Sequence, residues 1–319
     1  VTLCTWVLTL PVAAQTSTTV NNLTVLAPGE EGTDWKWNGN DFEVLRPGEF
    51  TFSSSGSTTS RVTVKASAAG VRLVLNNLSL VRDLGNWTGE DMNLEKDATA
   101  EMVLAEGSSN YMRGGMEGSS LRIDLNATLT VSGTGYLNVE AVKGGSAAAG
   151  HGAAIQVRRT GTLIVNSGTV EAVSHQNSQG CGAAIGSNQY NYEGDGAAGT
   201  VIVNGGKVIA TAGQYSAAIG GGGGSTYRDL NRNGAEGGTL IVNGGEVVAN
   251  GRIGAGYGTG GVSDKANGGT IEINGGTVTT TAELGSGTSC TTAGSITVSG
   301  GSLSTPTITV ADGAATVNS

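Results

Sequence analysis

The chain has 319 residues, of which 55 are glycine, while aromatic residues make up only 4% and charged residues 13%. So few large side chains argue against a compact globule of ordinary composition, and the abundance of Val, Ile, Leu, Ala and Thr argues against a disordered tract. The formal net charge is −9 and no stretch is rich in Lys or Arg, so we expect no nucleic-acid partner.

The first residues, VTLCTWVLTLPVAAQT, are apolar and end in small side chains. This pattern is typical of the hydrophobic region and cleavage site of a secretory signal, with cleavage near Ala14. We therefore assign residues 1–15 to the remainder of a signal peptide and expect the mature protein to be secreted or held at the cell surface. The alternative is a buried first strand. No later run of about 20 apolar residues predicts a membrane span.

Residues 16–60 precede the clear repeats and contain Trp35 and Trp37 in the segment DWKWNGNDFEV. We interpret this region as a cap, because the first coil of a repeat fold otherwise exposes an unpaired strand edge. Residues 61–319 are then predicted to form one repeat domain.

Similar segments recur along this domain. They are GVRLVLNNLSLV from Gly70, ATLTVSGTGYLNVEAV from Ala127, GTLIVNSGTVEAV from Gly161, GTVIVNGGKVIAT from Gly199, GTLIVNGGEVVAN from Gly238, GTIEINGGTVTTT from Gly269 and GSITVSGGSLSTP from Gly294. Between them lies a short Ala-Ala-Ile element, at Ile155, Ile185 and Ile219, with a degenerate copy at Ile253.

Each repeat reads as a strand, a tight turn and a second strand, with apolar residues at alternate positions such as Val201 and Val203. A β-hairpin has the same local pattern. A hairpin array, however, does not need a third small apolar element in every repeat. The sequence therefore predicts an all-β, single-stranded parallel β-helix with three short strands per coil, in which equivalent strands stack about 4.8 Å apart.

Two consequences follow from stacked coils. The turn asparagines should form a ladder of amide hydrogen bonds; they are Asn166, Asn204, Asn243 and Asn274. Cys181 and Cys290 lie about three coils apart, or about 14 Å, so we expect free thiols rather than a disulfide.

Polar and aromatic residues gather in the loops after the Ala-Ala-Ile element, at 187–199, 221–237 and 254–268. Because equivalent loops leave the same side of a solenoid, they should form one surface. Tyrosine rings stack against sugars, so the predicted carbohydrate-binding residues are Tyr190, Tyr192, Tyr215, Tyr227, Tyr257 and Arg228. The alternative is that these tyrosines only cover the edge of the core.

One loop also has oxygen-bearing side chains at alternate positions followed by glycine, like the first half of a calcium loop. The predicted ligands are Asp229, Asn231, Asn233 and Glu236, with Glu193 or Asp195 of the preceding loop as further donors. The alternative is a solvated turn without metal.

Residues suited to catalysis are few. His151 and His175 have no nearby Ser, Cys or Asp in a triad pattern. A polysaccharide lyase could use Arg228 or Arg252 as its cationic group, and a glycoside hydrolase could draw a carboxylate pair from Glu193, Asp195 and Glu236.

The segments VRLVLNNLSLV, ATAEMVLAEGSSNYM and GGTLIVNGGEVVA, together with the AAIG elements, resemble secreted bacterial β-helix proteins described as carbohydrate-binding, first recognised in cellulose-degrading clostridia. The chain is also similar to the AAIGGG and GGTVTINGGTVTA repeats of surface proteins from gut bacteria, over residues 60–310. The resemblance implies a right-handed β-helix that binds acidic or cellulosic plant polysaccharide, with calcium as a helper and no catalytic role.

Three functions remain open from the sequence. The first is an exported, non-enzymatic β-helix that binds polysaccharide or acts as a surface adhesin. The second is a polysaccharide lyase or glycoside hydrolase on the same fold. The third is a purely structural surface stalk.

Overall fold

The computed structural model describes residues 15–66, 68–82, 90–114, 118–141, 152–175, 182–189, 197–213, 215–224, 234–257, 266–285, 294–309 and 315–317. These residues form 31 strands, which assemble into three long sheets, and no helix. Within them, nothing of the length and apolarity that a membrane-crossing helix requires is found.

Sheet 1 has 12 strands. They are β1 (Gln15–Val20), β2 (Leu23–Pro28), β5 (Gly48–Ser54), β7 (Ala69–Leu75), β10 (Thr99–Leu104), β13 (Thr128–Gly133), β16 (Thr162–Val165), β19 (Thr200–Val203), β22 (Thr239–Val242), β25 (Thr270–Ile273), β28 (Ser295–Val298) and β31 (Ala315–Val317).

Sheet 2 has 8 strands and sheet 3 has 11. Sheet 2 consists of β8 (Ser79–Val81), β11 (Ser109–Arg113), β14 (Tyr136–Glu140), β17 (Thr169–Val173), β20 (Lys207–Thr211), β23 (Glu246–Asn250), β26 (Thr277–Thr280) and β29 (Ser302–Ser304). Sheet 3 consists of β3 (Trp35–Asn38), β4 (Asp41–Val44), β6 (Val62–Val64), β9 (Met92–Leu94), β12 (Leu121–Ile123), β15 (Ile155–Val157), β18 (Ile185–Gly186), β21 (Ile219–Gly220), β24 (Ile253–Gly254), β27 (Leu284–Gly285) and β30 (Ile308–Thr309).

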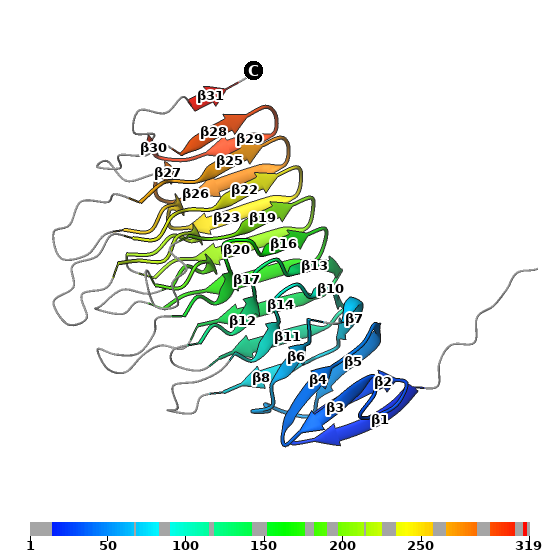
Figure 1. The fold of residues 1–319 in the computed structure, drawn as a ribbon. Helices are drawn as coiled ribbons and strands as arrows, with labels where there is room; N and C mark the ends of the chain where they lie inside the picture. Colours follow the sequence, from blue (N-terminus) through cyan, green and yellow to red (C-terminus); the bar gives the residue numbers. More distant parts are fainter. Residues whose placement is uncertain are drawn as a thin grey trace, which may run out of the picture.

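The chain visits sheets 1, 2 and 3 in turn, and each strand pairs in parallel with its equivalent in the next coil (Figure 1). In sheet 1, for example, Thr162 of β16 lies opposite Thr128 of β13 and Thr200 of β19. The two strands of one repeat therefore belong to different sheets and do not form a hairpin. The predicted parallel β-helix with three short strands per coil is confirmed.

Alternation of side chains places the core between the three sheets. In β19, Val201 and Val203 are buried, whereas Thr200 and Ile202 are partly exposed on the outer face. Because strand side chains alternate with a period of two, every second residue of each repeat contributes to one continuous apolar interior.

The N-terminal end of the molecule differs from the rest. β1 pairs with β2, β2 with β5 and β3 with β4 in antiparallel fashion, and parallel pairing begins with β4–β6 and β5–β7. Four aromatic rings pack here around Phe42, at centroid distances of 5.0 to 6.1 Å; they belong to Trp35, Trp37, Phe50 and Phe52. All three phenylalanines of the chain thus lie at this end.

The turns between sheets 1 and 2 carry the asparagine ladder (at the right in Figure 1). The Nδ2 atom of Asn204 donates to Oδ1 of Asn166 at 2.9 Å, and Asn243 donates to Asn204 at 2.8 Å. Asn274 continues the series by donating to Asn243 at 3.0 Å. The predicted ladder is confirmed, and it ties four successive coils together at the surface.

A second ladder explains the glycine of the AAIG element. Gly186, Gly220, Gly254 and Gly285 end successive strands of sheet 3, with φ between 113° and 144°. A Cβ atom on Gly220 would lie 2.1 Å from the carbonyl oxygen of Gly254. Only glycine permits both this backbone conformation and this approach between coils.

Candidate functional site

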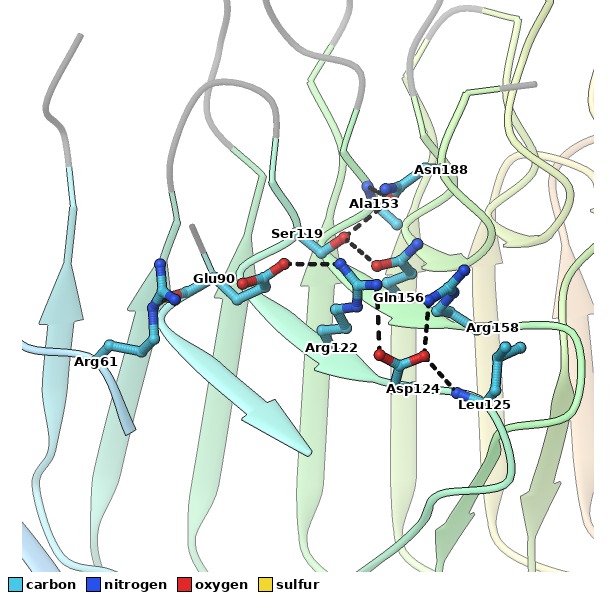
Figure 2. A network of polar contacts seen from close by, with 10 residues as sticks. All are labelled: Arg61, Glu90, Ser119, Arg122, Asp124, Leu125, Ala153, Gln156, Arg158 and Asn188. Carbon is cyan, nitrogen blue, oxygen red and sulfur yellow. Dashed lines mark hydrogen bonds and ion pairs between the residues drawn. The ribbon is translucent and has the colours of Figure 1, made fainter. Parts of the chain in front are cut away.

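Charged side chains cross successive coils on the outer face of sheet 3 (Figure 2). Arg122 on β12 contacts Glu90 through Nη1 at 3.0 Å and Asp124 through Nη2 at 3.4 Å. Arg158, one coil further, reaches the other oxygen of Asp124 at 2.7 Å. These four side chains are only 14% to 17% exposed, so they are held in fixed positions rather than extended into solvent.

A buried amide cluster borders this charged row. Ser119 Oγ lies 3.2 Å from Gln156 Oε1 and 2.9 Å from Asn188 Oδ1, and its single hydrogen is donated to either oxygen. Asn188 Oδ1 also accepts from the backbone N–H of Ala153 at 2.8 Å. Figure 2 shows that these groups come from three successive coils. The cluster therefore fixes the corner between sheets 2 and 3 beside the charged row.

A shallow depression of about 390 Å³ opens on this face. Its lining residues are Ala66, Glu90, Asn93, Glu95, Lys96, Arg122 and Asp124. Along its N-terminal side, Lys65 contacts Glu95 at 2.8 Å and Glu43 at 3.7 Å. Burial lowers the pKa of Lys65, but its contacts with Glu95 and Glu43 outweigh burial and raise it. The ammonium group is therefore a permanent charge beside the depression.

Around the corner, the outer face of sheet 2 carries tyrosines and carboxylates. The hydroxyl of Tyr111 on β11 donates to one oxygen of Glu140 on β14, and His175 Nε2 contacts the other oxygen. On the next pair of coils, the hydroxyl of Tyr136 on β14 donates to Glu171 on β17. These five side chains lie on three successive coils.

The same contacts set the ionisation of this cluster. Burial and the hydrogen bond to Glu140 raise the pKa of Tyr111 to about 12, and burial and Glu171 raise that of Tyr136 to about 12. Burial alone would raise the pKa of Glu140, but the hydrogen bonds from Tyr111 and His175 outweigh it and hold that pKa below its ordinary value. At neutral pH the phenols are neutral donors and Glu140 is a carboxylate.

We call these two groups together the polar flank. On sheet 3 it comprises Glu90, Arg122, Asp124 and Arg158, and on sheet 2 it comprises Tyr111, Tyr136, Glu140, Glu171 and His175.

Asp91 lies beneath the corner of the polar flank and is fully buried. Burial raises its pKa well above the ordinary value, although Arg82 and Arg61 act in the opposite direction. Because no part of its side chain reaches the surface, Asp91 belongs to the interior of the corner and not to a surface that a ligand touches.

Most residues predicted for sugar and metal binding lie outside the described residues. They are Tyr190, Tyr192, Tyr227, Arg228, Asp229, Asn231 and Asn233, with the further candidates Glu193 and Asp195. His151, Cys181 and Cys290 also lie outside the described residues. Tyr215 and Tyr257 are described, and the backbone N–H of Tyr257 donates to the carbonyl of Tyr215 at 2.8 Å. The backbone N–H of Gly224 donates to the carbonyl of Tyr257 at 2.8 Å, so the described parts of the loops 221–237 and 254–268 are neighbours.

Arg252 does not suit the role of a cationic group for lyase chemistry. Its side chain is 1% exposed, contacts Glu283 and donates to the carbonyl of Ala255 at 3.2 Å. Its guanidinium carbon also lies 3.4 Å from the centre of the Tyr257 ring. A polymer at the surface does not reach it, so this part of the lyase hypothesis is wrong.

Glu236, the last predicted calcium ligand, is exposed, and its backbone carbonyl accepts from Ala198 N–H at 3.0 Å. Within the part of the chain that the structure describes, no group of three or more His, Cys, Asp or Glu side chains could hold a metal ion. Calcium binding stays a prediction, since its other ligands lie outside that part.

Sequence reasoning missed the polar flank. Tyr111, Tyr136 and Arg122 sit at outward positions of strands whose neighbours are buried, in SNYMR, YLNVE and LRI. Alternation alone could have placed them on the outer surface. The tyrosines donate hydrogen bonds to carboxylates on adjacent coils, and these pairs can be identified only once the register of the strands is known.

No family model matches the chain, and no curated protein or solved structure was found to match it.

Proposed function

We propose that this protein is an exported, non-enzymatic β-helix that binds polysaccharide along the polar flank. The observation that carries the proposal is the arrangement of this flank, in which tyrosines, carboxylates and guanidinium groups from successive coils form rows parallel to the solenoid axis. The apolar, small-residue-terminated segment at residues 1–15 supports export.

The stacking of coils supports a polymeric ligand. Equivalent positions recur about every 4.8 Å along the axis, so an extended chain laid along the flank contacts polar groups from several successive coils. Tyrosine rings offer flat apolar surface beside sugar rings, and the carboxylates, amide and guanidinium groups offer donors and acceptors for hydroxyls. These groups are already oriented by their mutual contacts, which lowers the entropy lost on binding.

The ionisation of the flank favours binding over catalysis. A glycoside hydrolase needs a carboxylic acid that is still protonated at the working pH. Glu140 has a lowered pKa, and Asp91, whose pKa is raised, is buried. The charged groups on sheet 3 are likewise occupied by one another.

Affinity electrophoresis through gels that contain uronate polymers, cellulose derivatives or other soluble polysaccharides tests the proposal. We expect at least one polymer to retard the protein, and Arg122→Gln and Tyr136→Ala to reduce the retardation. The matched control is Arg72→Gln on sheet 1, because Arg72 also bridges two carboxylates, Glu49 at 2.9 Å and Glu101 at 2.7 Å.

Retardation that is equal in all variants would place the binding site elsewhere, and no retardation by any polymer would leave only the structural role. Repeating the assay with calcium and with a chelator tests the predicted ion. New reducing ends or unsaturated products after incubation would instead establish an enzyme.

A further inference from the structure

The outer face of sheet 1 carries a regular array of β-branched residues in its middle coils, from β13 to β22. One column is in register through five consecutive pairings and consists of Thr128, Thr162, Thr200, Thr239, Thr270 and Ser295. The column two residues further along each strand consists of Thr130, Ile164, Ile202, Ile241, Glu272 and Thr297. From β13 to β22 every member is half-buried, so each presents part of its side chain to solvent.

This array differs in charge from the earlier coils of sheet 1 and from the adjacent coils of sheet 2. Strands β13, β16, β19 and β22 contain no charged and no aromatic residue. The earlier coils of the same sheet carry the ion pairs of Arg72 with Glu49 and Glu101. On sheet 2, the coils beside the array carry the ion pair of Lys207 with Glu246, at 3.0 Å.

The array is also rigid and periodic in two directions. Its repeat is about 4.8 Å between coils and about 6.6 Å between alternate residues of one strand. Thr and Ile are restricted at χ1, so their methyl and hydroxyl groups are held in nearly fixed positions on the parallel sheet. The result is a small rectangular lattice of methyl groups with a column of hydroxyls.

We propose that this face of sheet 1, from β13 to β22, binds the surface of ice. Ice presents water molecules on lattices with similar two-dimensional repeats, so hydroxyls in register take the place of lattice water while methyl groups order the water between them. This activity is independent of polysaccharide binding on the polar flank.

The test follows the fluorescently labelled full chain as a single ice crystal grows from its solution, together with the gap between melting and freezing temperatures. We expect the protein to enter the ice and to open such a gap. The double variant Thr200→Lys/Thr239→Lys should lose both effects, because two ammonium groups in the array hold their own hydration shells. The matched control Thr279→Lys, at an outward position of β26 in sheet 2, should keep both.

Far-UV circular dichroism shows whether the double variant folds; if it does not, Thr239→Ala removes the hydroxyl and methyl without adding charge and should weaken both effects. Exclusion of the unaltered protein from ice overturns the proposal whatever the variants do. Equal loss in the sheet 1 and sheet 2 variants also overturns it. Concentration-dependent dimerisation that Thr200→Lys abolishes, without entry into ice, would identify the face as a protein interface and overturn it as well.

Discussion

The early and later coils join their neighbours in different ways at one and the same position of sheet 3. In register along this sheet, the position holds Thr63, Asn93, Arg122, Gln156, Gly186, Gly220, Gly254 and Gly285. In the early coils this position carries polar side chains, of which Arg122 and Gln156 contact neighbouring coils, whereas in the later coils it carries glycines that leave no room for a Cβ atom against the next coil. One fold thus provides a chemically varied surface at one end and a uniform, closely stacked one at the other.

The buried side chains of the interior also differ between the early and the later coils. At one inward position of sheet 1, the series in register is Phe50, Leu73, Met102, Val131, Val165, Val203, Val242, Ile273 and Val298. In this column the early coils bury large side chains, and the later coils bury β-branched ones of moderate size. The excess of glycine and the scarcity of aromatic residues in the composition both come from the later coils.

The largest effect should come from a methyl group added to the glycine ladder. Gly220→Ala places a Cβ atom 2.1 Å from the carbonyl oxygen of Gly254, at a φ of +128°. We expect a loss of about 5 kcal/mol in the free energy of unfolding, measured by urea denaturation followed by circular dichroism. Asn93→Ala, at the equivalent position of an early coil, should cost less than about 1 kcal/mol. Similar costs at Gly220 and Asn93 would contradict the difference between early and later coils at this position of sheet 3.

A smaller difference is expected in the core. Phe50→Ala should cost about 4 kcal/mol, because it removes a buried aromatic ring and leaves a cavity. Val203→Ala, in the same inward column, should cost about 2 kcal/mol, since only two methyl groups are lost. The comparison uses the same denaturation measurement. Equal costs would mean that the size of the buried side chain does not set the cost in this column.

The repeat made much of this predictable. The alternation in TVIVNGGKVIAT, the third element AAIG and the shared turn asparagines were enough for the parallel coil and the asparagine ladder. The reason why glycine follows each Ile was not predictable, because it depends on the carbonyl of the next coil. The polar flank was missed for a related reason, since contacts such as Tyr111 with Glu140 join residues that only the register brings together.

The asparagine ladder should contribute less than the core. Asn204→Ala removes the amide that joins Asn166 to Asn243, at an exposed turn. We expect a loss of about 1 kcal/mol in the same denaturation assay. Ser167→Ala, in the turn of the preceding coil, serves as the control and should be close to neutral. A neutral Asn204→Ala would mean that water replaces the ladder without loss.

The smallest effect concerns the tyrosines of the polar flank. Tyr111 and Tyr136 have pKa values raised from 10.0 to about 12, so their contribution to stability is fully present below pH 10 and is lost as the pH rises through about 12. Spectrophotometric titration should show Tyr111 and Tyr136 ionising late, together with Tyr257, whose pKa is also raised by burial. Tyr111→Phe and Tyr136→Phe should each remove one late step. Early ionisation of all tyrosines would contradict the contacts with Glu140 and Glu171.

The most direct test of the parallel register is disulfide cross-linking between turn positions, in a chain whose Cys4, Cys181 and Cys290 are replaced by serine. Asn204→Cys combined with Asn243→Cys puts thiols on adjacent coils, about 4.8 Å apart and within the range of a disulfide. Asn166→Cys combined with Asn243→Cys puts them about 9.6 Å apart, beyond that range. We predict that mild oxidation cross-links the first pair within one chain and leaves the second pair reduced. Failure of the first pair to cross-link, or equal cross-linking of both pairs, would contradict the stacked coils.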